Sequence, residues 1–255
     1  MYLKTVIAAV VLSCAAHTAH AQTQGAESME ANIQRKLDPT DFRSRLEFRT
    51  EHQRLRDDGS RNLVLPRMDY ALSKQLAFRV ELPFVADTPK NRPSDSGLGD
   101  LLGRMVYRVV RGDGYAWVVG GEVVFDTASE GLGAGTNLVT PLTFMSIDVP
   151  KYKSVLFPLY QYTFNVGGGP AIGFSTIRTS VLTRWPERYY TFVEPTLYVD
   201  HEHGSRGAGT FEVELGRFVS ADVALWARPG IGIRKHVMPQ VYDWNFEVGV
   251  RFFLN

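Results

Sequence analysis

Residues 99–125 constrain the fold of this chain more than any other stretch. Apolar side chains occupy every second position on both sides of a glycine-containing turn at residues 111–114, and the positions between them include Arg104, Arg108 and Glu122. Because a strand points alternate side chains to opposite faces, this pattern predicts a β-hairpin with one apolar face and one charged face. Each arm keeps the alternation for roughly 10 residues, the length that a tilted strand needs to cross a bilayer.

The aromatic residues of this hairpin support the same interpretation. Tyr107, Tyr115 and Trp117 lie near the turn. Membrane barrels carry girdles of aromatic side chains where the strands meet the membrane surface. The hypothesis is therefore a transmembrane β-barrel, and it requires further hairpins of the same kind in the rest of the chain.

The rest of the chain repeats the alternation. We place twelve strands at residues 42–51, 62–72, 76–84, 99–109, 115–125, 136–149, 152–166, 172–185, 189–200, 209–219, 222–234 and 242–254. The connections between them are short and long in turn, and outer-membrane barrels combine an even strand number with short periplasmic turns and longer external loops. We therefore predict an all-β protein, an antiparallel barrel of twelve strands over residues 41–255, with both the N-terminus and the C-terminus on the periplasmic side.

The chain begins with a pattern typical of secreted proteins. Lys4 precedes an apolar run at residues 5–16, and Ala19-His20-Ala21 precedes Gln22. This order predicts a signal peptide over residues 1–21 that is cleaved after Ala21, with a lipoprotein signal at Cys14 as the alternative. We expect residues 22–40 to form a mobile periplasmic leader with a short helix at 28–37, the alternative being a segment that tucks into the lumen. No later stretch approaches about 18 consecutive apolar residues, so no transmembrane helix is predicted.

Charge and cysteine content exclude several functional classes. Loss of Lys4 with the signal peptide lowers the number of basic residues from 28 to 27, against 27 acidic residues. A net charge near zero argues against nucleic acid as a partner. Cys14 is the only cysteine, so the mature chain has neither disulfides nor a thiolate zinc site. We expect the outer membrane of a Gram-negative bacterium as the location, its lipids and the barrel-assembly machinery as partners, and no cofactor.

The charged register supplies the candidate residues that line the lumen. They are Arg79, Glu81, Arg104, Arg108, Glu122, Arg178, Glu194, Glu212, Glu214, Arg228, Arg234 and Glu247. Buried charges must be paired or hydrated, so these residues form either a salt-bridge network that fills a structural barrel or the lining of a charged channel. Barrels of about 8 strands are filled by side chains, and those of 16 or more strands are open. A barrel of twelve strands lies between these limits, so the strand number leaves both interpretations open.

Chemistry outside the lumen has a weaker basis in the sequence. His201 and His203 are two residues apart with no third ligand at a fixed spacing, so no metal site is predicted. Ser205 follows closely and suggests an outer-membrane lipid hydrolase, in which a histidine activates a serine. No third group in a recognisable motif accompanies this pair. We therefore predict that the chain is not an enzyme but a channel or transporter that passes small solutes by passive diffusion. Over the whole inward register, which besides the candidates above includes residues such as Arg45, Arg49 and Arg67, arginines outnumber acids twelve to nine, and this favours anionic solutes.

Three segments of the chain carry a family resemblance. They are Val80-Glu81-Leu82-Pro83-Phe84 with the preceding residues 70–76, Ser96-Gly97-Leu98-Gly99-Asp100, and Leu132-Gly133-Ala134-Gly135-Thr136. They resemble the outer-membrane family named for transport in the meta-pathway of phenol degradation, and the resemblance covers most of the mature chain. It implies a barrel that passes small, often aromatic, solutes. The chain departs from the family pattern at Asp126-Thr127-Ala128 and at its end, Phe253-Leu254-Asn255.

Overall fold

The computed structural model describes residues 29–56, 58–91, 93–234 and 241–254. The predicted signal peptide at residues 1–21, Cys14 and the first part of the predicted leader lie outside these ranges. The described chain contains one α-helix and fourteen strand segments. None of its helices is both long enough and apolar enough to cross a membrane.

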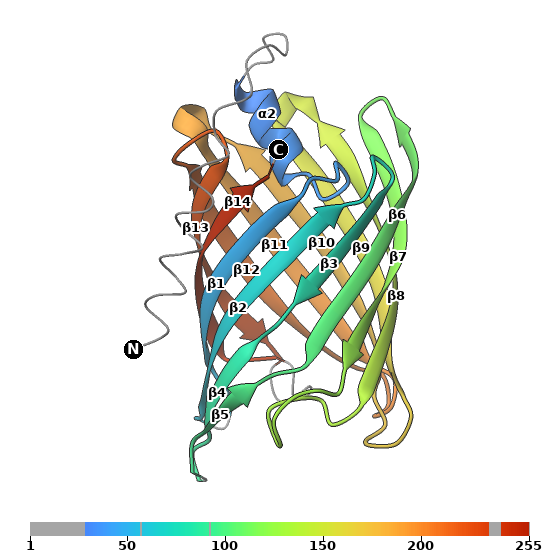
Figure 1. Ribbon diagram of the computed structural model, residues 1–255, viewed down its shortest axis with the longest axis vertical. Coiled ribbons are helices and arrows are strands. Elements are labelled where there is room, and N and C mark those ends of the chain that lie inside the picture. The colour runs from blue at the N-terminus through green and yellow to red at the C-terminus, as the bar shows by residue number, and fades with distance from the viewer. Residues whose placement is uncertain (1–28, 57, 92, 235–240, 255) are drawn as a thin grey trace.

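The strands form one closed antiparallel sheet (Figure 1). The barrel closes because β1 pairs with β2 on one side and with β14 on the other. In chain order the elements are α2 (Met29–Leu37), β1 (Arg45–Arg54), β2 (Ser60–Ala71), β3 (Leu76–Glu81), β4 (Phe84–Thr88), β5 (Asp95–Leu98), β6 (Leu101–Gly112), β7 (Tyr115–Phe125), β8 (Asn137–Val149), the 3-10 turn η1 (Pro150–Tyr152), β9 (Ser154–Val166), β10 (Gly173–Arg184), the 3-10 turn η2 (Pro186–Arg188), β11 (Tyr189–Asp200), β12 (Arg206–Phe218), β13 (Val223–Ile233) and β14 (Trp244–Phe253).

Two of the barrel strands are interrupted, so the fourteen segments make twelve strands. β3 and β4 pair in succession with β2, and the break between them is at Leu82 and Pro83. β6 and β5 pair with β3 and β4 in the same way, with a break at Gly99 and Asp100. The Gly99 N–H donates to the Pro83 carbonyl oxygen at 2.8 Å and joins the two breaks. The prediction of a twelve-stranded antiparallel barrel is therefore confirmed.

The predicted outward register is the apolar outer surface of the barrel. On β14, Trp244, Phe246 and Val248 are exposed, whereas Asn245 and Glu247 between them are buried inside. The same alternation holds on the other long strands, and the exposed side chains include Phe48, Val64, Met68, Phe78, Met105, Tyr107, Tyr115, Trp117, Ile177, Leu197, Phe211, Leu215, Leu225 and Ile231. An outer surface of this kind is suited to lipid rather than to water.

The connections are sorted to the two ends of the barrel. One end, here called the short-turn end, carries the turns at 72–75, 113–114, 150–153, 186–188 and 219–222. The other, the long-loop end, carries the loops that follow β1, β4, β7, β9 and β11. Because the strand number is even, the described ends of the chain, Met29 and Leu254, both lie at the short-turn end (Figure 1).

Aromatic side chains fill the interior near the short-turn end. Tyr190 and Trp226 are 1% and 4% exposed, within a cluster that spans β9 to β14. Glycine makes room for both rings, because a Cβ at Gly216 would lie 2.1 Å from Tyr190 and one at Gly249 would lie 2.5 Å from Trp226. The glycines inside these strands are therefore packing positions in a narrow barrel.

The outward register predicts the response of the barrel to charge. Arginine at Val248, in the middle of β14, should lower the free energy of unfolding in lipid vesicles by about 2–4 kcal/mol, because a lipid-facing guanidinium is costly at mid-membrane depth. Arginine at Ile233, at the end of β13, should cost about 0–1 kcal/mol, since cost falls toward the interface. Denaturant titration measures both, and equal costs would show that the membrane depth assigned to β14 is wrong.

Candidate functional site

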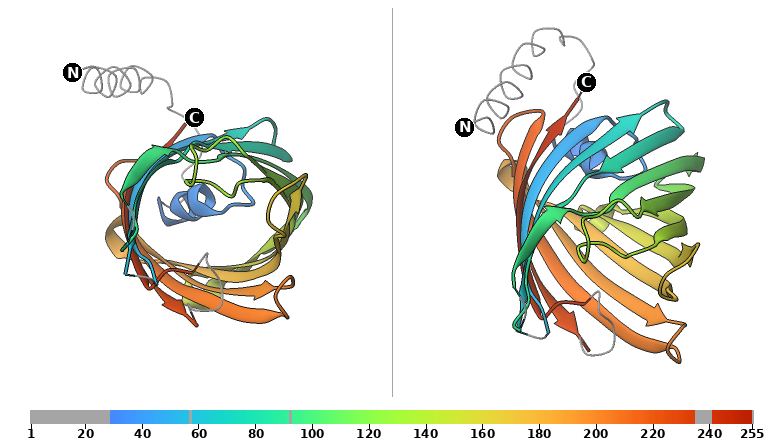
Figure 2. Two further views of the ribbon diagram at one scale, coloured as in Figure 1. Left: turned by 90° about the horizontal axis from the view of Figure 1, so that it is seen from below. Right: turned by 60° about the horizontal axis from the view of Figure 1, so that its bottom comes forward.

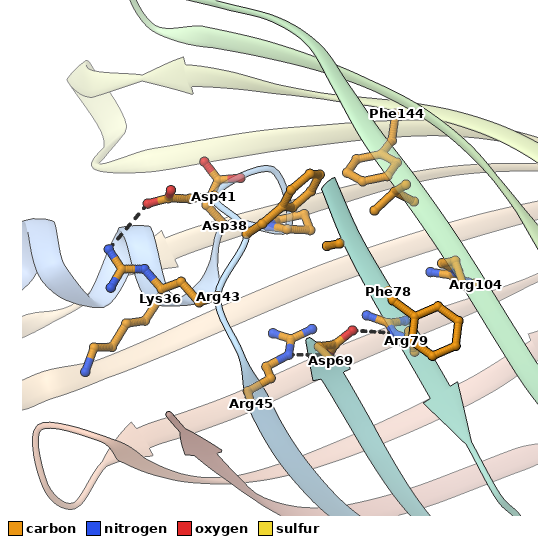
Figure 3. Close-up of a pocket in the computed structure, with 14 residues that line it drawn as sticks. Lys36, Asp38, Asp41, Arg43, Arg45, Asp69, Phe78, Arg79, Arg104 and Phe144 are labelled. Carbon is orange, nitrogen blue, oxygen red and sulfur yellow. Dashed lines mark hydrogen bonds and ion pairs between the residues drawn. The ribbon is translucent and has the colours of Figure 1, made fainter. Parts of the chain in front are cut away.

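A continuous chain of ion pairs follows the inner wall from β10 round to β3. It connects Arg178 on β10, Glu194 on β11, Arg228 on β13, Glu214 on β12, Arg251 on β14, Glu47 on β1, Arg67 on β2 and Glu81 on β3. The chain of ion pairs continues through Arg79, Asp69 and Arg45. Figure 3 shows the guanidinium groups of Arg79 and Arg45 pointing at the Asp69 carboxylate. The two Asp69 contacts are each 2.6 Å long.

Strand register brings these charges together. Glu47 lies directly opposite Arg251 of β14 on one side and Arg67 of β2 on the other. Arg104 and Glu122 face each other in the same way on β6 and β7, and their contact is 2.5 Å long. Opposite charges at facing positions stabilise a strand pair, whereas an unpaired charge inside the wall would be costly. Not every inward charge faces an opposite one, because Glu194 faces Glu212 and finds its partners in Arg178 and Arg228 instead.

The opposite part of the inner wall is apolar. Val106, Val118, Leu142, Phe144 and Leu159 form a buried cluster on β6 to β9. These side chains are 0% to 8% exposed. The interior therefore has a charged wall and an apolar wall, a division that the sequence analysis did not predict, because it took apolar side chains as lipid-facing throughout.

A cavity of about 300 Å³ lies between the two walls. Its charged lining consists of eight arginines and two glutamates, namely Arg45, Arg49, Arg67, Arg79, Arg104, Arg178, Arg228, Arg251, Glu81 and Glu194. Its apolar lining includes Phe144, Phe157, Leu159 and Phe192. Several acids that pair with the arginines, such as Glu47 and Glu214, are 1% exposed and do not line the cavity. The surface presented to a solute is therefore predominantly cationic.

The N-terminal segment differs from the mobile leader that we expected. Figure 2 shows α2 inside the barrel at the short-turn end. Ile33 and Leu37, one turn apart on α2, are 5% and 3% exposed and pack on the aromatic cluster described above. The Lys36 ammonium contacts Asp222 at 2.5 Å and the Ala221 carbonyl oxygen at 2.7 Å. The leader was expected to be mobile because chain termini are poorly ordered unless they are tied down. A nine-residue helix is marginal by itself, and here the barrel interior supplies the surface that stabilises it, as in the alternative of a segment that tucks into the lumen.

The residues after α2 are also fixed to the inner wall. The Thr40 hydroxyl lies 2.9 Å from that of Ser146, and the Thr40 carbonyl oxygen accepts a 2.9 Å hydrogen bond from Arg108. Asp38 accepts hydrogen bonds from the Thr40 N–H and hydroxyl, while burial raises the pKa of its carboxyl. A pocket of about 70 Å³ separates this segment from the charged wall (Figure 3). Leu37 and Pro39 line the larger cavity, so α2 and the following turn cover its short-turn side.

The structure places the predicted lumen residues in three groups. Arg79, Glu81, Arg104, Arg178, Glu194 and Arg228 line the cavity. Glu122, Glu212, Glu214 and Glu247 point into the lumen beside them and contact arginines. Arg108 lies near the N-terminal segment, and Arg234 follows the last residue of β13 and is exposed, so neither belongs to the cavity. The rest of the lining consists of Leu37, Pro39, Arg45, Arg49, Arg67, Leu102, Phe144, Phe157, Leu159, Ser180, Phe192 and Arg251.

Asp100 connects two of the segments that carry the family resemblance. Its carboxylate accepts hydrogen bonds from the backbone N–H groups of Thr127, Ala128 and Ala134 at 2.7 to 3.1 Å. The glycine-rich loop at 126–136 is thereby held against β5. Gly97 permits this packing, because a Cβ there would lie 2.3 Å from the Ser129 hydroxyl. The serine-glycine and glycine-rich segments are therefore one structural unit, which was not evident from their separation in the sequence.

The groups considered for other chemistry, His201, His203 and Ser205, lie in the turn after β11 at the long-loop end. Ser205 is in the turn after β11, whereas a different serine, Ser175, lies 2.9 Å from the His201 Nε2 atom. Ser175 shares the outward register of the exposed Ile177, is 7% exposed itself, and also contacts the Tyr160 hydroxyl at 3.2 Å. Among the described residues no group of three or more His, Cys, Asp or Glu side chains could hold a metal ion.

Comparison with solved structures identifies outer-membrane porins and channels with this fold. The NanC porin superposes with a TM-score of 0.62 at 13% identity, over 82% of this chain and 100% of that one. The KdgM porin in complex with disordered oligogalacturonate gives 0.58 at 13% identity, over 83% and 99%. The COG4313 outer membrane channel from Pseudomonas putida F1 gives 0.62 at 12% identity, over 86% and 100%. No protein-family model and no curated protein matches the chain.

The ion-pair chain predicts a large effect of removing one central acid. Glutamine at Glu214 keeps the shape of the side chain but leaves Arg228 and Arg251 without the carboxylate that they share at 2.5 to 2.9 Å. We expect the free energy of unfolding to fall by about 3–5 kcal/mol, measured by denaturant titration in vesicles. Glutamine at Glu130, an exposed residue of the 126–136 loop, is the control and should cause no measurable change. Equal stability of the two variants would mean that the ion-pair chain does not stabilise the barrel.

Proposed function

We propose that this chain is an outer-membrane channel through which small anionic solutes pass by passive diffusion. The observation that carries the proposal is the lining of the 300 Å³ cavity by eight arginines and only two glutamates. A cavity of about this volume holds a small organic molecule. Selection in such a lumen rests on size and charge, with no catalytic group required.

The contacts of the arginines favour anions further. Among the described residues, the ion pairs of Arg49 and Arg178 are long, 3.4 Å to Glu247 and 3.3 Å to Glu194. Their side chains are 19% and 34% exposed. Guanidinium groups pair with carboxylates through several N–H donors. The accessible part of these two arginines can therefore contact an anion in the cavity although each is also held by the wall.

The similar structures support the proposal because they are outer-membrane porins and channels, and because one of them was solved with an anionic ligand. NanC, KdgM and the Pseudomonas putida protein are porins or an outer-membrane channel, and KdgM was solved with oligogalacturonate, a polymer that carries carboxylates. The resemblance to the phenol-pathway family adds small aromatic solutes as a class to test. In this proposal the signal peptide directs the chain to the outer membrane, the short-turn end faces the periplasm, and the barrel-assembly machinery inserts it among the outer-membrane lipids.

The anion selectivity of an Arg49→Gln variant tests the role of the charged lining. Glutamine at Arg49 should lower the chloride-to-potassium permeability ratio by roughly 2-fold, since removing a unit charge about 8 Å away in water changes an ion's energy by about 0.5 kcal/mol. The measurement is the reversal potential of purified protein in a planar bilayer under a salt gradient. Glutamine at Arg217, on the outer face over the ring of Tyr189, is the control and should leave the ratio unchanged.

Two results would contradict the proposal. Absence of conductance at any voltage would favour a structural barrel filled by its ion pairs. Release of fatty acid from lipid that disappears in the Ser175→Ala variant would favour the hydrolase, because Ser175 is the serine that contacts a histidine at 2.9 Å.

The position of α2 predicts that the N-terminal segment limits the conductance. In the Lys36→Glu variant the 2.5 Å ion pair with Asp222 is replaced by two carboxylates that repel each other. This repulsion should weaken the docking of α2. We expect a larger single-channel conductance than in the unmodified protein, because α2 and the following turn cover one side of the cavity. Glutamate at Lys74, exposed in the turn at the same end, is the control. An unchanged conductance in the Lys36 variant would show that the passage does not depend on the docking of α2.

A further inference from the structure

One row of side chains crosses the boundary between the apolar and the charged wall. Phe144 of β8 pairs with Leu159 of β9, and Leu159 pairs with Arg178 of β10. All three side chains line the same cavity. Neighbouring strands are about 4.8 Å apart, so the row places a cation beside an apolar surface roughly 10 Å wide.

Arg178 is the most accessible arginine of the cavity. Its side chain is 34% exposed, against 7% to 19% for the other seven. Its one ion pair, to Glu194 at 3.3 Å, is long, and the other oxygen of that carboxylate accepts a 2.5 Å hydrogen bond from Ser180. A guanidinium has five N–H donors. The Nε donor of Arg178 is buried, so its Nη donors are the ones that a ligand in the cavity can reach.

The apolar surface next to Arg178 is larger than the row itself. Phe157 of β9 and Phe192 of β11 also line the cavity, with ring centroids 6.2 Å apart. These four side chains offer no partner for a hydroxyl group, and a polar group buried without a hydrogen bond is costly. Ser180, which pairs with Phe157 across the strands and also lines the cavity, already donates its hydroxyl to Glu194. A solute that fits both parts has an anionic end and an apolar body.

The geometry points to a binding site in the lumen for amphipathic carboxylates, in which Arg178 binds the carboxylate and Phe144, Leu159 and Phe157 contact an aliphatic or aromatic body. This inference rests on the proposed channel function and narrows its substrate class. Acidic sugars would gain the contact to Arg178 but would place their hydroxyl groups against the apolar wall. The site therefore binds amphipathic carboxylates more tightly than acidic sugars of the same charge.

Hexanoate and gluconate test the site as a matched pair, because each has six carbons and one carboxylate and only gluconate has hydroxyl groups. Single-channel chloride current through the purified full chain is recorded while either anion is added. Hexanoate should reduce the current at concentrations roughly 10-fold lower than gluconate. Benzoate should behave like hexanoate.

Two variants test whether the block by hexanoate depends on the row formed by Phe144, Leu159 and Arg178. Arg178→Gln should raise the concentration of hexanoate for half block by roughly 10-fold, because a hydrogen-bonded charge contact is lost. Leu159→Ser should weaken the block by hexanoate and leave that by gluconate unchanged. Arg217→Gln is the control, because Arg217 lies on the outer face over the ring of Tyr189, so both blocking concentrations should stay as in the unmodified protein. A gel shift on boiling verifies that each variant is folded.

The possible failures are distinguishable. Equal block by hexanoate and gluconate, or an Arg178→Gln variant that hexanoate blocks as before, would overturn the site while the chloride current still supports the channel. If the protein conducts no current, the proposed function fails, and calorimetric titration of the detergent-solubilised protein with hexanoate then decides on the site. Heat of binding that Arg178→Gln abolishes would support it, and absence of binding to the unmodified protein would overturn it.

Discussion

Pairing of charges on the inner wall is the constraint on which this barrel depends. Glu47 and Glu214 are each 1% exposed, and each is held between two arginines from different strands. A buried ion pair adds little stability over an apolar pair of the same shape, but a buried charge without its partner is strongly destabilising. The chain of pairs therefore specifies register, because a strand shifted by one residue would turn charges into lipid and apolar side chains into the lumen.

The ion pairs occupy only part of the circumference, and this determines where the cavity lies. From β10 round to β6 the inner wall is charged, whereas β6 to β9 contribute Val106, Leu142 and Phe144 to an apolar surface. The cavity lies where the two surfaces face each other, and Leu37 and Pro39 of the N-terminal segment cover it on one side. One interior thus combines a structural network with a lining that presents cations, so the two interpretations left open by the sequence describe different parts of the same wall.

Particular residues show how far sequence reasoning reaches. Arg104 and Glu122 were assigned to the inward face from alternation alone, and they form a direct cross-strand pair. The same alternation did not identify Phe144 as an inward residue, since an apolar side chain is compatible with either lipid or a packed interior. For Ile33 and Leu37 the sequence predicted only that they belong to a short helix, because the surface that binds them comes from β9 to β14, more than a hundred residues later.

The sequence by itself determined the class of the fold, the number of strands, the sorting of short and long connections and the face on which most charges lie. These features follow from a period of two and from turn residues, which are local properties of the chain. Only the tertiary structure decided which charges pair across non-adjacent strands, as Arg251 and Glu214 do, and that the interior has two walls with a cavity between them. Closure of the barrel is the physical reason, because it brings β14 beside β1 and encloses the N-terminal helix within side chains that are distant in sequence.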